Sequence, residues 1–282
     1  MTTWLITGTS SGFGRHLTEI LLERGDTVAA TLRSPSRLDD LAEIHGDRLW
    51  RRSLDVTDAT RTRAVVDEAF AELGTIDVVV SNAGYGLFGA AEELSDEQVD
   101  RQLATNVTGA ITLVRAVVPH LRTQGGGRIL QVASMGGQLA FPGMSLYHAS
   151  KWALEGFFEA LSPELAPFGI STTLIEPGMS RTGFGGASAD VAPPLAAYAD
   201  TPAAAFVRGH LPLEAMPGHP RKMAAAMIAV AELADPPLRQ ALGSDADAMI
   251  RATLLARLDA MDEHRDLALS TDADDYVAAP AR

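Results

Sequence analysis

A tyrosine and a lysine four residues apart are the side chains of this sequence best suited to do chemistry together. Tyr147 and Lys151 lie within residues 146–166, whose pattern predicts a helix. Residues four apart project from one helical face, so a phenol and an ammonium can address the same small molecule. Lysine is rare here, since the only other one is Lys222. An ammonium can lose or relay a proton, whereas a guanidinium stays charged, so the pair suggests proton chemistry.

The elements that must position this pair alternate between short apolar runs and longer amphipathic ones. Such alternation is typical of a parallel sheet with helices on both faces. We predict strands at residues 4–6, 27–32, 48–54, 76–80, 128–133, 170–175 and 240–242, and helices at 15–24, 35–45, 58–73, 95–121, 146–166, 223–233 and 245–259. The predicted fold class is therefore α/β, a doubly wound parallel sheet of about seven strands.

The chain changes character after Pro177 and Gly178. Residues 179–220 are rich in proline and glycine yet keep many apolar side chains, which favours a helical lid over an apolar substrate pocket. Residues 221–270 predict a helical extension, and the acidic tail 271–282 is expected to be loosely held. We interpret residues 1–282 as one catalytic domain.

Composition excludes several classes of function. The net charge of -13 disfavours nucleic acid or an anionic membrane as a partner. With Cys 0 there is no disulfide, thiol nucleophile or thiolate metal site, and we expect no metal. No signal peptide or membrane-spanning run is apparent, so a cytoplasmic location is expected.

A glycine-rich turn follows the first predicted strand and opens the first helix. It comprises Gly8, Ser10, Ser11, Gly12, Phe13 and Gly14 in the spacing GxxxGxG. Glycines let the turn tighten and let backbone amides approach a pyrophosphate near the positive end of the helix. The turn therefore predicts a dinucleotide phosphate site, although a purely structural turn has the same composition.

The same turn contains GxSxG, the pattern of a serine hydrolase nucleophile, with Ser10 at its centre. His210, His219 and His264 could in principle complete a triad. That alternative leaves Gly14, Arg33 and the tyrosine–lysine pair unexplained, so we retain it as the less favoured one.

The end of the second strand carries Arg33, followed by Arg37, where an NAD-binding domain usually has an acidic residue. Guanidinium groups with neighbouring hydroxyls suit a phosphate dianion. The sequence therefore predicts a preference for NADP(H) over NAD(H).

These motifs together resemble the short-chain dehydrogenase/reductase superfamily, over about residues 3–182. The resemblance lies in the order of the glycine loop, Asp55 and Val56, Asn82-Ala83-Gly84, Asn106, Ser134, the pair Tyr147 and Lys151, and Pro177-Gly178 with Thr182. It implies a Rossmann-type fold in which Asp55 and Val56 border the adenine, Asn82 to Gly84 steady the sheet beside the cofactor, and Pro177 and Gly178 face the nicotinamide.

In this interpretation Tyr147 is the general acid in reduction and the base in oxidation. A cation nearby lowers a phenol's pKa, so we expect Lys151 to lower that of Tyr147. Ser134 would orient the substrate oxygen. The resemblance further implies that Lys151 holds the nicotinamide ribose and that Asn106 keeps a water connecting the lysine to solvent. His148 is assigned no chemistry.

The surroundings of the predicted site are apolar. Its expected lining is Leu87, Met135, Phe141, Phe184, Tyr198 and Phe206, which suggests a hydrophobic ketone, aldehyde or secondary alcohol. The apolar arc of residues 152–161 suggests a homodimer or homotetramer. A cofactor-binding regulatory protein without turnover remains a second alternative.

Overall fold

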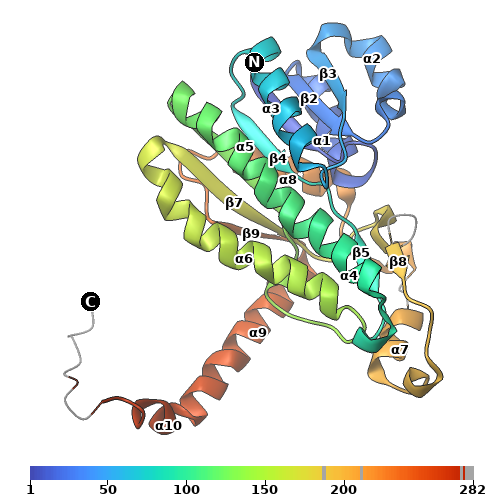
Figure 1. The fold of residues 1–282 in the computed structure, drawn as a ribbon, viewed down its shortest axis with the longest axis vertical. Helices are drawn as coiled ribbons and strands as arrows, with labels where there is room; N and C mark the ends of the chain where they lie inside the picture. Colours follow the sequence, from blue (N-terminus) through green and yellow to red (C-terminus); the bar gives the residue numbers. More distant parts are fainter. Residues whose placement is uncertain (186–188, 210–211, 274–275, 277–282) are drawn as a thin grey trace.

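Seven parallel strands form the central sheet of the computed structural model, which describes residues 1–185, 189–209, 212–273 and 276 (Figure 1). The strand order is β3-β2-β1-β4-β6-β7-β9. Their bounds are β1 Thr3–Thr7, β2 Thr27–Leu32, β3 Leu49–Ser53, β4 Val78–Ser81, β6 Gly127–Val132, β7 Ile170–Pro177 and β9 Arg239–Leu242. The predicted doubly wound α/β fold is confirmed, and all seven predicted strands are present with ends shifted by at most two residues.

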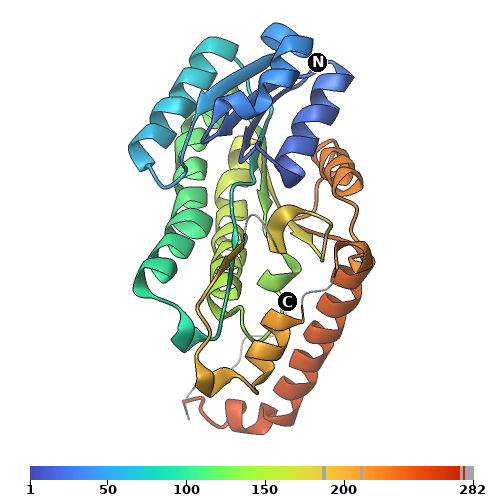
Figure 2. The same cartoon turned by 90° about the vertical axis from the view of Figure 1, so that its right-hand side faces the viewer.

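Two layers of helices sandwich the sheet (Figure 2). One face carries α1 Gly12–Arg24, α2 Asp39–His45 and α8 Pro220–Ala231, and the other carries α3 Ala59–Leu73, α5 Gly109–Gln124 and α6 Ser145–Leu165. Side chains alternate between these faces along each strand. In β1, Trp4 and Ile6 pack under the first layer while Leu5 packs under the second. Burial on both faces explains why the central strands are apolar throughout.

The chain reverses its direction of strand addition between β1 and β4, which are neighbours in the sheet. Strands β2 and β3 extend the sheet on one side of β1, and β6, β7 and β9 extend it on the other. Loops at the carboxyl ends of β1 and β4 therefore diverge, which opens a crevice where doubly wound sheets bind ligands.

Residues 95–121, predicted as one helix, instead form three consecutive segments. Helix α4 covers Asp96–Leu103, a π-helical turn covers Ala104–Thr108, and α5 follows. A Cβ on Gly109 would lie 2.9 Å from the Val56 carbonyl oxygen, so the helix packs tightly there. Helix α4 begins with a capping box, in which the Ser95 hydroxyl accepts from the Gln98 amide at 3.2 Å and Gln98 Oε1 accepts from the Ser95 amide at 3.1 Å.

The segment expected to be a helical lid, residues 179–220, is more varied than predicted. It contains strand β8 Ala189–Val191, which pairs with β5 Gly86–Phe88 in a second small sheet, and the short helix α7 Pro202–Arg208. His210, Leu211 and most of the tail after 273 lie outside the described residues. The chain ends in α9 Ser244–Glu263 and α10 Arg265–Leu269, which extend away from the body (Figure 1).

Candidate active site

One cavity of about 1010 Å³ opens along the carboxyl ends of the strands and is lined by most of the predicted site residues. Those that line it are Gly8, Ser10, Ser11, Gly12, Phe13, Arg33, Asp55, Val56, Asn82, Ala83, Gly84, Ser134, Met135, Phe141, Tyr147, Lys151, Pro177, Gly178, Thr182, Phe184 and Phe206. Its lining does not include the predicted residues Gly14, Arg37, Asn106, Leu87 and Tyr198. The fold thus gathers side chains from six strand ends into one place.

The glycine loop is shaped by its own backbone and by close packing. Gly8 has φ 73° and Gly12 has φ 55°, both in the left-handed region that favours glycine. A Cβ on Gly14 would lie 2.4 Å from the Gly8 carbonyl oxygen, so this glycine lets α1 approach β1 rather than lining the cavity. Helix α1 starts at Gly12 and presents its unpaired amides at the cavity, which suits an anionic ligand.

Asn82, at the end of β4, holds this loop in place. Its Nδ2 donates to the carbonyl oxygens of Thr7 at 2.9 Å and Gly8 at 3.1 Å. The backbone amides of Asn82 and Ala83 both donate to the Thr7 hydroxyl, at 3.0 and 3.1 Å. Four hydrogen bonds therefore join the end of β4 to the end of β1, where Asn82 was expected to steady the sheet.

Arg33 and Asp55 face the cavity from the ends of β2 and β3. Asp55 accepts from the Thr57 amide at 3.0 Å and from the Thr57 hydroxyl at 2.7 Å. The Thr57 amide lowers the pKa of Asp55 most, with further contributions from the hydroxyl and from the positive charge of Arg33. Arg37 was also predicted to bind the cofactor. It lies in a 3₁₀ turn, and its exposed side chain does not line the cavity.

Ser134, Tyr147 and Lys151 meet in the middle of the cavity. Ser134 follows β6, and its hydroxyl accepts from the Gly136 amide at 3.0 Å and hydrogen-bonds Tyr147. Lys151 Nζ donates to the Val132 carbonyl oxygen at 2.9 Å and lies 5.8 Å from the Tyr147 ring centroid. Both Tyr147 and Lys151 are buried.

The electrostatics of this pair differ from the sequence-based expectation. Burial raises the pKa of Tyr147 to about 12, and the hydrogen bond with Ser134 opposes that rise. Burial also lowers the pKa of Lys151 to about 8, while the negative charge of Glu155 opposes that fall. The expected lowering of the Tyr147 pKa by Lys151 is not found, because desolvation of the phenol is the largest effect and Lys151 is not among the groups that shift this pKa. The neutral phenol, unlike the tyrosinate, carries a proton that it can donate.

Asn106 lies in the π-helical turn behind the cavity, and its side chain is fully engaged. Its Oδ1 accepts from the Tyr85 amide at 3.2 Å, and its Nδ2 donates to the Tyr85 carbonyl at 3.1 Å and the Ser150 hydroxyl at 3.2 Å. The Ser150 hydroxyl donates to the Tyr147 carbonyl at 2.7 Å. Asn106 therefore links the loop after β4 to the helix that carries the tyrosine.

The part of the cavity beyond Tyr147 is apolar. Phe141 stacks on Phe206 at 5.2 Å, and Phe184 packs edge-on against Tyr147 at 5.1 Å. The lining is completed by Phe88, Met144, Met179, Met216 and Met249. Of these, Met144, Met179 and Met249 were not predicted, because they come from separate segments that share no local pattern.

Two residues predicted to line this apolar part are elsewhere. Leu87 is buried with 1% exposure and points to the opposite face of β5 from Phe88, because side chains alternate along a strand. Tyr198 sits outside the cavity, where its hydroxyl donates to Glu92 at 3.0 Å.

A polar cluster borders the apolar part and was not predicted. Arg101 of α4 forms an ion pair with Asp190 of β8 and donates to the Tyr85 hydroxyl at 3.4 Å. Gln98 Nε2 donates to the other oxygen of Asp190 at 3.0 Å. This cluster ties β8 to α4.

Residues 2–190 match the family described as short chain dehydrogenase, and this match covers more than half of the chain. The chain belongs to this family.

Curated members of the short-chain dehydrogenase family resemble most of the chain. It is 37% identical to "Oxidoreductase BOA17" of Botryotinia fuckeliana, over 86% of this chain and 89% of that protein. It is 35% identical to the "3-ketodihydrosphingosine reductase" of Bacteroides thetaiotaomicron, over 85% of this chain and 87% of that one. The chain is therefore an oxidoreductase of this family.

Solved short-chain dehydrogenases share the fold closely. One from Streptomyces avermitilis has a TM-score of 0.89 at 38% identity, covering 96% of this chain and all of that one (100%). An alcohol dehydrogenase from Thermococcus sibiricus, solved with 5-hydroxy-NADP, has a TM-score of 0.73 at 26% identity, covering 86% and 97%.

In this short-chain dehydrogenase His148 organises the loop after Ser134, a role that sequence reasoning missed. Its Nδ1 is 2.9 Å from the Gly136 carbonyl oxygen, and its Nε2 accepts from the Phe141 amide at 2.9 Å. Burial lowers the pKa of His148, which favours the neutral ring that can both donate and accept. The position of His148 next to Tyr147 in the sequence does not indicate this role, because the hydrogen-bond partners of His148 lie in another segment.

The geometry gives no support to the serine hydrolase alternative. Ser10 lies in the glycine loop, while neither His219 nor His264 lines the cavity, and His210 lies outside the described residues. The histidine that does line it, His148, is held by the loop after Ser134. Within the described ranges no cluster of potential metal ligands occurs, and no helix is long and apolar enough to cross a membrane.

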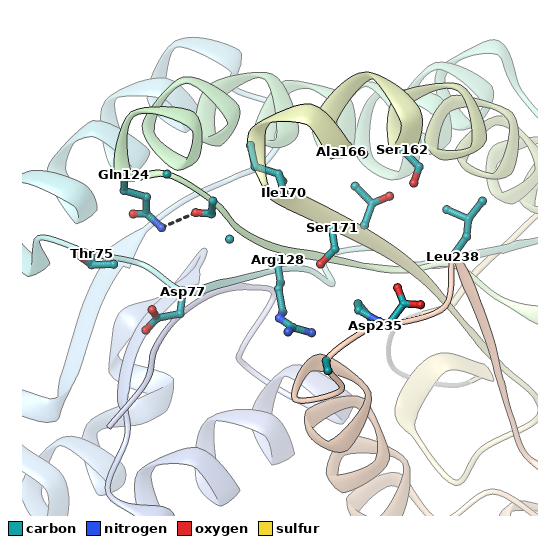
Figure 3. Close-up of a pocket in the computed structure, with 17 residues that line it drawn as sticks. Thr75, Asp77, Gln124, Arg128, Ser162, Ala166, Ile170, Ser171, Asp235 and Leu238 are labelled. Carbon is teal, nitrogen blue, oxygen red and sulfur yellow. Dashed lines mark hydrogen bonds between the residues drawn. The ribbon is translucent and has the colours of Figure 1, made fainter.

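A second hollow lies at the opposite, amino ends of the strands (Figure 3). Its floor includes Asp77, Gln124 and Arg128, and Gln124 Nε2 donates to the Gly126 carbonyl oxygen at 2.8 Å. None of the predicted site residues lines it. We therefore place the chemistry in the first cavity.

Proposed function

We propose that this short-chain dehydrogenase reduces a hydrophobic ketone or aldehyde with NADPH and, in reverse, oxidises the corresponding secondary alcohol. The proposal rests on one observation: Ser134, Tyr147 and Lys151 share a cavity with the glycine loop on one side and an apolar region on the other. A carbonyl held there would be within reach of both a proton donor and a bound dinucleotide. The whole chain is proposed to act as one catalytic domain.

The cavity has the features that a dinucleotide requires. A Cβ on Gly14 would strike the Gly8 carbonyl, so the loop keeps its tight curvature only with glycine, and the amides at the start of α1 are directed at the cavity. We propose that residues 8–14 hold the pyrophosphate, that Asp55 and Val56 border the adenine, and that Pro177, Gly178 and Thr182 lie beside the nicotinamide. When bound, the nicotinamide supplies or accepts the hydride.

Proton transfer is assigned to the chain's own groups. Tyr147, neutral because of burial, donates its proton to the carbonyl oxygen in reduction. Ser134 orients that oxygen and stabilises its developing charge, and Lys151 would hold the nicotinamide ribose. Asn106 positions the tyrosine helix through Ser150. In oxidation the same groups act in the opposite order.

The substrate class follows from the lining. Phe88, Phe141, Met144, Phe184 and Phe206 offer apolar contact with few polar groups, which favours an aryl ketone or another bulky apolar carbonyl compound. One relative is named for the reduction of a keto compound, 3-ketodihydrosphingosine, which agrees with a carbonyl substrate.

The first test follows NADPH absorbance with a panel of ketones and aldehydes graded by size. Tyr147→Phe is expected to abolish turnover and leave NADPH affinity nearly unchanged, because only the transferable proton is removed. Substantial turnover by the variant would refute the role of Tyr147. NADPH binding without turnover of any carbonyl in the panel would favour a regulatory protein.

The second test concerns cofactor choice. We propose that Arg33 binds the extra phosphate of NADP, since its exposed guanidinium borders the cavity. Loss of a charge-assisted hydrogen bond costs about 1.5–3 kcal/mol, so Arg33→Ala should lower kcat/KM for NADPH about 10- to 100-fold and change that for NADH little. Arg37→Ala is the matched control and should change neither. Equal efficiency of the parent protein with NADH would contradict the preference.

A further inference from the structure

Two glutamates are buried side by side behind the catalytic helix. Glu155 lies one turn beyond Lys151 on α6, and Glu176 lies at the end of β7. Their side chains are only 8% and 4% exposed. Buried carboxylates are costly unless they are paired, so two of them together require an explanation.

The positive charge available to this pair is limited. Arg239 of β9 donates to Glu155 Oε2 at 2.8 Å and lies 3.9 Å from Glu176, yet the same guanidinium also bonds Glu159 at 2.5 Å. Gln138 Nε2 donates to both buried carboxyls, at 3.1 and 2.9 Å. One partly exposed arginine therefore serves three carboxyl groups, which favours retention of a proton by the buried two.

The pair also contacts both parts of the catalytic machinery. Gln138 belongs to the loop that begins at Ser134, and its carbonyl accepts from Arg257 of α9 at 2.5 Å. A Cβ on Gly137 would lie 2.9 Å from Glu155 Oε1, so loop and carboxyl are packed together. Along α6, Tyr147, Lys151 and Glu155 are spaced by four residues and follow one face.

We propose that Glu155 and Glu176 share one proton and that Glu155 is a positioning residue, which acts on catalysis by setting the charge of Lys151. The charged and titratable groups around Glu155 are Lys151 and Glu159 on its own helix, Glu176 on β7, Arg239 on β9 and Arg257 on α9. The meaning of this inference for catalysis rests on the proposed function. The shared proton and its effect on Lys151 are properties of the chain that do not require turnover.

The electrostatics of the site agree with a shared proton. Burial, followed by the charge of Glu176, raises the pKa of Glu155 well above its usual range, and burial raises that of Glu176 as well. Glu155 in turn raises the pKa of Lys151 against the effect of burial. Ionised Glu155 therefore keeps Lys151 charged to higher pH, and protonated Glu155 does not.

The sign of the effect differs between the two glutamates. Glu155→Gln removes the negative charge beside Lys151, so the pKa of Lys151 should fall. Glu176→Gln removes the neighbour that keeps Glu155 protonated, so Glu155 ionises more fully and the pKa of Lys151 should rise. Charges a helical turn apart interact enough, at the effective dielectric constant of a protein, to give a shift of about half a pH unit to one unit. If the two glutamates had a purely structural role, their substitutions would not shift the pKa of Lys151 in opposite directions.

The test uses the scarcity of lysine. The chain contains two lysines, Lys151 and Lys222, so ¹³Cε-lysine labelling gives one NMR signal for each, and Lys222 is the internal reference. Titrations of the parent and the variants should show the Lys151 pKa lowered in Glu155→Gln, raised in Glu176→Gln and unmoved in Glu159→Gln. Glu159 is the control because it bonds the same arginine from an exposed position.

Shifts in the same direction for both buried glutamates, or no shift in either, would overturn the proposal. If Glu155→Gln does not fold, Glu176→Gln alone must still raise the Lys151 pKa. The pH profile of kcat/KM with NADPH and the best ketone of the panel should move with the NMR values. Because the NMR titration requires no turnover, failure of this inference and failure of the proposed function are distinguishable.

Discussion

The surroundings of Tyr147 determine its protonation state. Its phenol is buried next to Ser134, and burial raises its pKa to about 12, so it stays protonated throughout the neutral range. A buried neutral phenol can donate a proton but is a poor base. At pH 7 the residue is therefore in the protonated form that the proposed reduction requires.

A pH dependence follows from this arrangement. Reduction requires protonated Tyr147 and charged Lys151; the tyrosine keeps its proton, and the lysine loses its own as pH rises through about 8. Ketone reduction should be constant from pH 6 to 7 and decline above about pH 8. Alcohol oxidation requires the tyrosinate and should rise with pH from 6 upward. Measurement of kcat/KM in both directions tests this, and faster oxidation at pH 6 than at pH 9 would contradict it.

Strand β8 is one of the elements that attach the segment after β7 to the rest of the molecule. It pairs with β5, and Asp190 within it is held by Arg101 and Gln98 of α4. A three-residue strand has little intrinsic stability, so these side chains matter for its position. The lid in turn supplies Phe184 and Phe206 to the apolar part of the cavity.

Removal of this attachment should affect substrate binding more than cofactor binding. Arg101→Ala is expected to raise KM for the ketone about two- to fivefold, as an exposed ion pair contributes up to about 1 kcal/mol. The NADPH affinity should stay unchanged, because the glycine loop lies elsewhere. Arg63→Ala, an exposed arginine of α3 that donates to Ala59 of its own helix, is the control. A loss confined to NADPH affinity would refute this role.

At the scale of the whole molecule, six of the exposed large apolar side chains among the described residues lie on the C-terminal helices α9 and α10, and only one lies on α6. Leu154 and Phe158 of α6 are fully buried, while Phe157 and Leu161 pack against the same core. Trp152 is the one large apolar residue of that arc that is exposed, and Arg257 stacks on its ring at 4.5 Å. Most of the apolar arc of α6 is thus used inside one subunit.

Helix α9 instead exposes leucines as it leaves the body of the molecule (Figure 1). Leu255 and Leu258 are 57% and 58% exposed, so we propose that a homo-oligomer forms through this helix. Light scattering at micromolar concentration should give a mass above the 29.8 kDa of one chain. Leu255→Glu with Leu258→Glu should lower it, whereas Leu233→Glu, at another exposed leucine, should not. A monomeric parent protein would contradict the proposal.

The sequence alone determined the fold class and the family. Alternating apolar and amphipathic runs predict the doubly wound sheet because burial on both faces demands continuous apolar strands. The ordered motifs, from the glycine loop to Tyr147 and Lys151, identify the family because each depends on short-range spacing. Their backbone requirements, such as the positive φ of Gly8 and Gly12, are local too.

Only the tertiary structure decided which side chains share the cavity and what their charges do. Arg33 borders the cavity and Arg37 does not, since a short turn separates their directions. His148 and the pair Glu155 and Glu176 matter through contacts with segments remote in sequence, and the raised pKa of Tyr147 depends on burial by several elements at once. Spacing along one chain carries local geometry, whereas desolvation and long-range pairing depend on how the elements pack.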